Sequence, residues 1–244
     1  MSDRLPPPGA IVLAGGFGTR VSHLLPGIPK PMAPVAGRPF VEWVVRYFAK
    51  WGCREFVLAT GHLSKTIEDH FITQPVPGVS VTCRVERTPL GTAGGCLNAL
   101  PPDRDDRRRW LVANGDSLVF ADPRPLLPPI DAGIADAALL GLALPDAGRF
   151  GSLDIGAENT LKAFREKCPG AGTINAGVYA FSERALRAQP EKRPLSFELD
   201  VFPALASQNR VHVATVTAPF LDIGTPATLA EAERFVLAHH AHFL

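Results

Sequence analysis

The sequence is poor in the features that mark several large classes of protein. It holds four cysteines among 244 residues and no Cys-x-x-Cys pair, so neither a disulfide framework nor a zinc site is expected. Its formal net charge of +1 gives no reason to expect nucleic acid or an anionic membrane as a partner. No apolar run approaches the length that crosses a bilayer. We therefore expect a cytoplasmic protein. Because the net charge is close to zero, any region of positive electrostatic potential should be confined to a small part of its surface.

What is present is the composition of an ordinary globular protein, with 46% hydrophobic and 20% charged residues. Strand-like apolar segments alternate with amphipathic helical ones. The predicted strands are 10–13, 55–60, 79–85 and 110–113, and the predicted helices are 40–51, 64–71 (capped by Ser64) and 93–100. This βαβαβαβ order predicts an α/β fold with a doubly wound, mostly parallel, Rossmann-like sheet between two helical layers.

The alternation of strands and helices ends after residue 137. Strands are predicted at 151–155, 161–164, 173–181 and 211–216, and helices at 197–206 and 226–239. This pattern predicts a small β-rich insertion over the first sheet. The charged run 101–109 (PPDRDDRRR) is expected to be a solvated loop, and the histidines at 239, 240 and 242 are expected to be exposed on a terminal helix.

A glycine-rich turn follows the first strand. Gly15, Gly16 and Gly18 leave backbone N–H groups free to approach an anion, and Arg20 and Lys30 follow them with two positive charges. Neither the Walker loop nor the dinucleotide fingerprint matches this run. Ligands of doubly wound sheets bind beyond the carboxyl ends of strands, where this loop and Asp116 should meet. The chemistry indicates a triphosphate site.

The string 13–20 (LAGGFGTR) followed by 29–32 (PKPM) resembles the signature of the sugar-phosphate nucleotidyltransferases, or nucleotide-sugar pyrophosphorylases. Five further segments match that family in order. They are 89–94 (PLGTAG), 114–116 (NGD), 164–167 (FREK), 174–179 (INAGVY) and 221–226 (LDIGTP). The resemblance implies a single domain with a nucleotide-binding half at about 10–136, a sugar-binding half at about 137–225 and a C-terminal helix at 226–244.

The resemblance also implies the reaction. A nucleoside monophosphate passes from a triphosphate to a sugar 1-phosphate, and pyrophosphate leaves. Within the family, the sequences of segments 24–35 and 149–155 most resemble those of guanylyltransferases of D-glycero-D-manno-heptose 1-phosphate, which make GDP-heptose for surface polysaccharide. Mannose 1-phosphate guanylyltransferase and a uridylyltransferase of the same family are the alternatives.

Four residues carry the implied chemistry: Arg20 and Lys30 neutralise the triphosphate, and Asp116 and Asp222 hold Mg²⁺. Hard oxygen ligands suit this ion. Taken singly, Asp116 is equally well a turn carboxylate, and Asp222 a turn or cap residue before Pro226. The implied nucleotide contacts are Leu13, Ala14, Gly15, Gly16, Gly18, Thr19, Glu86, Leu90, Gly91, Thr92, Asn114 and Gly115.

The implied contacts to the sugar phosphate are Gly151, Glu166, Lys167, Asn175, Gly177 and Glu198. For Glu166 and Lys167 the competing interpretation is a solvated strand end, and for Glu198 it is a carboxylate at a helix N-terminus. Glu86 favours GTP, since a carboxylate only accepts hydrogen bonds and guanine offers two adjacent donors. A surface position for Glu86 is the alternative.

Two rival functions belong to other classes. A catalytically silent regulatory subunit that binds nucleotide sugars should have lost some of the four chemical residues, and all four are present. A glycosyltransferase usually carries an Asp-x-Asp metal motif, where this chain has Asp116-Ser117-Leu118. The oligomeric state is left open, because one sequence identifies no interface.

Overall fold

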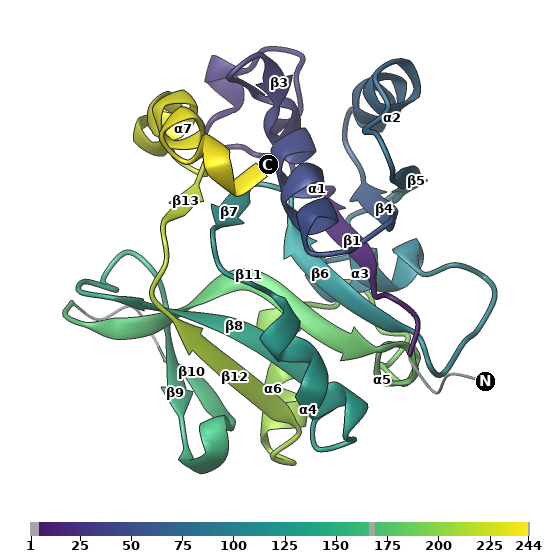
Figure 1. Cartoon of the computed structure of the whole chain (residues 1–244), viewed down its shortest axis with the longest axis vertical. Helices are drawn as coiled ribbons and strands as arrows, with labels where there is room; N and C mark the ends of the chain where they lie inside the picture. Colours follow the sequence, from purple (N-terminus) through teal and green to yellow (C-terminus); the bar gives the residue numbers. More distant parts are fainter. Residues whose placement is uncertain (1–4, 166–168, 244) are drawn as a thin grey trace.

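The computed structural model describes residues 5–165 and 169–243. Its centre is a nine-stranded sheet with the order β10-β9-β11-β6-β1-β4-β5, in which β8 also pairs with β11 and β12 pairs with β8 (Figure 1). In the first half of the chain β1 pairs in parallel with both β4 and β6, and β4 pairs in parallel with β5. The strands are β1 (Gly9–Ala14), β4 (Glu55–Thr60), β5 (Ser80–Val85) and β6 (Arg109–Asn114).

Along the chain, the helices of this half alternate with its strands, as the sequence predicts. They are α1 (Phe40–Lys50), α2 (Ser64–Thr73) and α3 (Thr92–Ala99). The predicted cap of α2 is wrong. Ser64 is inside the helix, and Leu63 holds the cap position in a left-handed conformation with φ of 57° and no side-chain hydrogen bond. A small hairpin of β2 (Pro34–Val35) and β3 (Arg38–Pro39) precedes α1.

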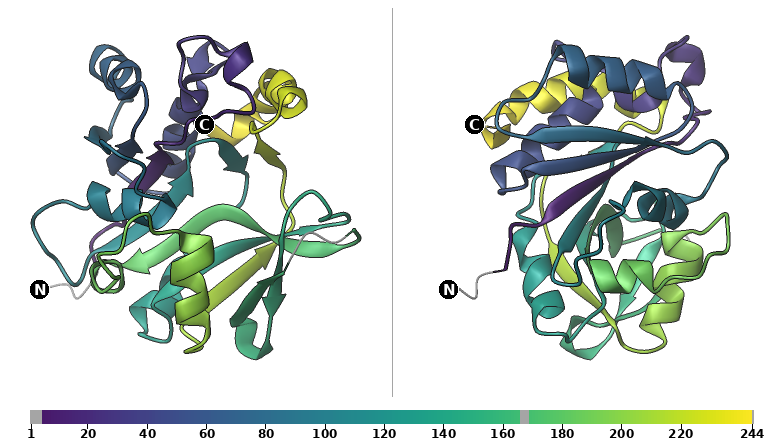
Figure 2. Two further views of the ribbon diagram at one scale, coloured as in Figure 1. Left: turned by 180° about the vertical axis from the view of Figure 1, so that it is seen from behind. Right: turned by 90° about the vertical axis from the view of Figure 1, so that its right-hand side faces the viewer.

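Two hydrophobic cores sandwich the sheet, because successive side chains of a strand point to opposite faces. Ala10 and Val12 of β1 belong to one core, and Ile11 between them belongs to the other. The first core contains buried residues of α1, α2, α4 and α7, and the second contains those of α3, α5 and α6 (Figure 2). The added helices are α4 (Leu127–Asp131), α5 (Glu183–Arg187), α6 (Phe202–Ala206) and α7 (Pro226–Ala238).

The predicted β-rich insertion does not lie over the first sheet as a separate one, because the strands of the second half join the main sheet. β11 pairs antiparallel with both β6 and β8, and β12 pairs in parallel with β8. The strands are β8 (Ala137–Leu144), β9 (Ser152–Ile155), β10 (Leu161–Arg165), β11 (Gly172–Ser182) and β12 (Val211–Val216). One sheet through both halves supports our proposal of a single domain.

Residues 197–206 form two short helical pieces where one helix was predicted. A π-helical turn, η5 (Phe197–Val201), runs directly into α6. Ser196 caps this turn, since its hydroxyl accepts hydrogen bonds from the backbone N–H groups of Glu198 and Leu199. A proline at 203 fits the first turn of α6, where no backbone donor is needed.

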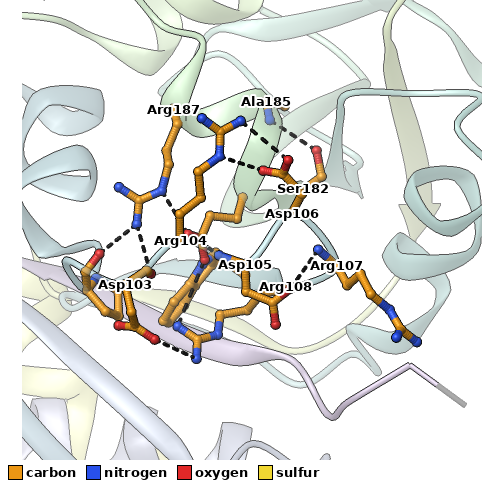
Figure 3. Close-up of polar contacts among 12 residues, drawn as sticks. Asp103, Arg104, Asp105, Asp106, Arg107, Arg108, Ser182, Ala185 and Arg187 are labelled. Carbon is orange, nitrogen blue, oxygen red and sulfur yellow. Dashed lines mark hydrogen bonds and ion pairs between the residues drawn. The ribbon is translucent and has the colours of Figure 1, made fainter.

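The charged run 101–109 is mostly the solvated loop predicted from its composition, since residues 102–104, Asp106 and Arg107 are exposed, but other residues of the run contact buried groups. Glu183 is fully buried at the start of α5 and accepts hydrogen bonds from Arg187, from the indole of Trp110 and from the backbone of Asp105. Arg108 lies 3.9 Å from the same carboxylate, and Figure 3 shows Arg187 of α5 hydrogen-bonded to the loop while Arg107 extends away from it. Arg109 is also buried, beside Asp131 at 2.8 Å.

Replacing Glu183 by alanine is expected to lower the free energy of unfolding by about 3–5 kcal/mol, because it leaves buried hydrogen-bond donors and arginines without their carboxylate partner. Chemical denaturation followed by circular dichroism measures the loss. Asp106→Ala is the matched control, since it removes an exposed carboxylate paired with Arg104 in the same loop, and its denaturation midpoint should stay unchanged. Equal midpoints for the two variants would contradict the structural role of Glu183.

Candidate active site at the carboxyl ends of β1 and β6

A cavity of about 320 Å³ lies beyond the carboxyl ends of β1 and β6, on the side of the sheet that α3 covers. Leu13 of β1 is level with Asn114 of β6 in the parallel pair, so the segments after both strands emerge together. The backbone N–H of Gly115 donates to the carbonyl of Leu13 at 2.9 Å and holds the two exits side by side. The lining residues are Leu13, Gly15, Gly16, Phe17, Ala59, Glu86, Pro89, Gly91, Thr92, Gly95, Asn114 and Asp116.

The glycine loop places Lys30 against this opening. Gly18 has φ of +60°, and a Cβ there would lie 2.8 Å from Cβ of Lys30, so a side chain would push the lysine away. Gly16 has open space where its Cβ would stand among the described residues. The ammonium group of Lys30 forms an ion pair with Asp116. The loop therefore brings a cation to the mouth of the cavity and leaves room beside it.

Asp222 reaches the same place from the other end of the chain. It ends β13 (Phe220–Asp222), which pairs antiparallel with β7 (Ser117–Val119), and Asp222 is opposite Ser117 in the register. The backbone N–H of Ile223 donates to the carbonyl of Asp116 at 3.0 Å. The pairing of these two short strands sets the second carboxylate beside the first.

The groups around Asp222 shift its pKa in opposite directions. Burial raises the pKa of the Asp222 carboxyl above its ordinary value and the negative charge of Asp116 adds to the rise, while the N–H of Gly224 and the charges of Lys30 and Arg20 oppose it. Arg20 is exposed, and its guanidinium lies 3.3 Å from the place where a Cβ on Gly224 would stand. Both predicted cations and both predicted carboxylates thus meet in one place.

Asp222 is not the cap of the following helix, which was its alternative interpretation. Thr225 caps α7 in a capping box with Thr228. The carboxylate of Asp222 does accept a hydrogen bond from the N–H of Gly224, as a turn residue would.

The stack of Phe235 and His242 on Phe120 fastens α7 and the following residues to the end of β7. His239 and His242 are half-buried in that stack, so the predicted exposure holds only for His240.

Glu86 lies inside the cavity, not on the surface. Three glycines crowd it, since a Cβ on Gly15 or Gly61 would lie 2.5 or 3.0 Å from its Oε1, and one on Gly95 would lie 3.5 Å from its Oε2. The backbone N–H of Leu90 donates to Oε2 at 3.2 Å. Burial raises the pKa of Glu86, and the hydrogen bond from Leu90 opposes the rise.

The predicted sugar contacts gather next to the cavity. The Oδ1 of Asn175 accepts a hydrogen bond from the N–H of Gly177 at 2.9 Å, and a Cβ on Gly177 would lie 2.5 Å from the amide of Asn114. Glu198 accepts a hydrogen bond from the hydroxyl of Thr92 at 3.0 Å. Gly151 precedes β9, where Ser152 pairs with Ile174 beside Asn175. Glu166 and Lys167 lie outside the described residues.

Five other predicted nucleotide residues do not line the cavity. Ala14 is buried at the end of β1, Thr19 is exposed in the turn after Gly18, and Gly18, Leu90 and Gly115 support the loops as described above. A Cβ on Gly91, which has φ of +79°, would lie 2.4 Å from the carbonyl of Leu195. Gly91 thus lets the segment before η5 pack against the start of α3.

Comparison with known proteins identifies the family of this chain. The model of the nucleotidyl transferase family matches residues 9–239. The chain belongs to the nucleotidyl transferase family. Mannose-1-phosphate guanylyltransferase of Mycobacterium tuberculosis is 34% identical over 89% of this chain, which spans only 61% of that relative. D-glycero-alpha-D-manno-heptose 1-phosphate guanylyltransferase of Aneurinibacillus thermoaerophilus is 30% identical, over 92% of this chain and 96% of the relative.

The solved structures show the same fold. HddC from Yersinia pseudotuberculosis is 30% identical and superposes with a TM-score of 0.81, over 93% of this chain and 98% of that one. A second structure of HddC, complexed with GMP-PN, has a TM-score of 0.78. The predicted Rossmann-like fold and the predicted family are therefore confirmed for this nucleotidyl transferase.

Sequence reasoning missed several residues of this nucleotidyl transferase. Phe17, Ala59, Pro89 and Gly95 line the cavity but were not predicted as contacts. Phe17 is a large apolar side chain in a glycine-rich loop, and that placement is a signal for a cavity-lining role. Ala59 and Gly95 have no comparable signal, because small residues in a strand and a helix also serve ordinary packing.

Proposed function

We propose that this chain transfers GMP from GTP to a sugar 1-phosphate, D-glycero-D-manno-heptose 1-phosphate, and releases GDP-heptose and pyrophosphate. The observation that carries the proposal is the convergence of Lys30, Asp116 and Asp222 at the mouth of a cavity that holds Glu86. The heptose guanylyltransferase that matches the chain over nearly its whole length supports the choice of acceptor. The compartment that we propose is the cytoplasm; among the described residues no helix is long and apolar enough to cross a membrane.

The reaction needs positioning and charge neutralisation rather than a nucleophilic side chain. An oxygen of the sugar phosphate attacks the α-phosphorus of GTP, a new P–O bond forms, and the bond to the oxygen bridging the α- and β-phosphates breaks. Pyrophosphate leaves with that bond's electrons. Lys30 and Arg20 would offset the repulsion between two anions, and the N–H groups of the glycine loop would face the phosphate oxygens.

Asp116 and Asp222 fit a magnesium ion. They are neighbouring carboxylates. Burial and, after it, the charge of Asp116 raise the pKa of Asp222, and a bound cation would offset both effects. The described residues contain no group of three or more metal-binding side chains, so water and phosphate would complete the coordination. When bound, Mg²⁺ would stabilise negative charge on the triphosphate.

The sugar phosphate would bind on the other side of Asn114. Asn175 and Gly177 on β11 and Glu198 on η5 border the cavity through Asn114 and Thr92, and Gly151 stands at the start of the next strand. We keep Glu166 and Lys167 in this set as proposals from the sequence. The hydroxyls of a sugar are matched by amide and carboxylate groups of this kind.

A matrix of the four nucleoside triphosphates against heptose 1-phosphate, mannose 1-phosphate and N-acetylhexosamine 1-phosphates tests the proposal. Pyrophosphate release should be fastest for GTP with heptose 1-phosphate. Turnover of GTP with mannose 1-phosphate alone would favour the second candidate, which the 34% identity to the mycobacterial relative supports. No pyrophosphate release from any pair would overturn the proposed function.

Replacing Glu86 by glutamine is expected to lower the preference for GTP over UTP by about tenfold, because the change puts a donor where guanine offers donors. The ratio of kcat/KM for the two triphosphates measures this preference. Gln74→Glu, on the surface after α2, is a control for the reverse exchange of the two side chains. An unaltered ratio in Glu86→Gln would show that Glu86 does not recognise the base.

A further inference from the structure

Tyr179 on β11 is fully buried, and its hydroxyl joins two of the proposed sugar contacts. The amide Nδ2 of Asn175 donates to this hydroxyl at 2.9 Å. The hydroxyl in turn donates to Oε1 of Glu198 at 3.3 Å. The ring packs among Phe197 and Phe202 at centroid distances of 5.4 and 5.0 Å, so it has little freedom to move.

Glu198 continues the chain of hydrogen bonds toward the nucleotide cavity. Its Oε2 accepts from the hydroxyls of Thr92 at 3.0 Å and Ser196 at 2.9 Å. Thr92 lines the nucleotide cavity at the start of α3 and accepts the backbone N–H of Phe197 at 2.9 Å. One carboxylate is therefore held by hydroxyls from β11, from α3 and from its own segment.

The direction of these hydrogen bonds is fixed by chemistry. Burial raises the pKa of Tyr179 well above its ordinary value, and the charge of Glu198 adds to the rise, so the hydroxyl keeps its proton. Since that single proton goes to Glu198, the oxygen is left to accept from Asn175. The amide of Asn175 is thereby held with its Oδ1 toward the N–H of Gly177.

We propose that Tyr179 is a positioning residue for the sugar 1-phosphate. Its hydroxyl fixes the amide of Asn175 and the carboxylate of Glu198 relative to each other, and through Glu198 and Thr92 it ties the sugar subsite to the nucleotide cavity. This inference rests on the proposed function, because it takes Asn175 and Glu198 as sugar contacts.

Tyr179→Phe tests the role, because it removes the hydroxyl and keeps the packed ring. The KM for the sugar 1-phosphate that the wild-type protein uses should rise about tenfold, while the KM for GTP should stay within about twofold. Tyr47→Phe is the matched control. Tyr47, the other of the two tyrosines in the chain, is also buried, and its hydroxyl donates to the carbonyl of Ala121 at 3.0 Å, away from the cavity. Its variant should leave both KM values unchanged.

A double variant distinguishes positioning from a general loss of structure. If Tyr179 acts through Glu198, Tyr179→Phe combined with Glu198→Gln should raise the KM for the sugar 1-phosphate no further than the larger single effect. Effects that multiply would overturn the inference, as would Tyr179→Phe kinetics that match those of Tyr47→Phe. A wild-type protein that uses no sugar 1-phosphate would instead overturn the proposed function, and this inference with it.

Discussion

Replacing Lys30 by alanine is expected to lower kcat for pyrophosphate release about a thousandfold. Lys30 stands at the cavity mouth, in contact with Gly18 and paired with Asp116. Its charge pairs with Asp116 and lowers the pKa of Asp222, so it would stabilise the charge that grows on the phosphates as the α-phosphorus is attacked. Steady-state kinetics at saturating GTP and sugar 1-phosphate measure the effect.

The control for this change is Lys65→Ala. Lys65 is an exposed lysine of α2, paired with Asp69 at 2.8 Å, and its loss should leave kcat as it is. Lys30→Arg separates charge from shape, because arginine keeps the charge but replaces a compact ammonium by a wide planar group. Lys30→Ala with near-normal turnover would refute the proposed role of this residue.

Asp222→Asn is expected to raise the Mg²⁺ concentration needed for half-maximal turnover at least about tenfold and to lower kcat at saturating metal. The change keeps the shape of the side chain and its hydrogen bond from Gly224, and it removes one of two charges that would hold the ion. Titration of Mg²⁺ against pyrophosphate release measures both quantities, and Asp116→Asn should behave in the same way.

Asp69→Asn serves as the control for the aspartate variants, since Asp69 is an exposed carboxylate on α2 outside the cavity. Its Mg²⁺ dependence should equal that of the wild-type protein. An Asp222→Asn protein with the wild-type metal dependence would show that the pairing of β13 with β7 serves only the fold.

The strands and helices of the first half follow closely from the sequence, because their apolar patterns are local and strong. The segment 55–60 is observed as predicted, and the glycine loop leaves β1 beside the exit of β6. The rule that parallel strands end at one edge was enough to bring Asp116 to the loop. Family resemblance supplied Asp222, whose place no local pattern reveals.

The features that sequence reasoning missed depend on long-range contacts. β13 has three residues and gains its strand conformation only by pairing with β7, about a hundred positions earlier in the chain. The contact of the charged run 101–109 with Glu183 could not be predicted, because Glu183 follows the run by more than seventy residues. Likewise, the proposed role of the Tyr179 hydroxyl depends on its hydrogen bonds with Glu198 and Asn175, and the sequence does not show which way the side chain points.

The position of the metal tests the central claim most directly. A crystal of the protein with Mn²⁺ and a non-hydrolysable GTP analogue would locate the ion by its anomalous scattering. We expect one peak between the carboxylates of Asp116 and Asp222, with the phosphates against Lys30 and the guanine beside Glu86. A peak bound away from either aspartate, or a triphosphate lying outside the cavity, would contradict the proposed site.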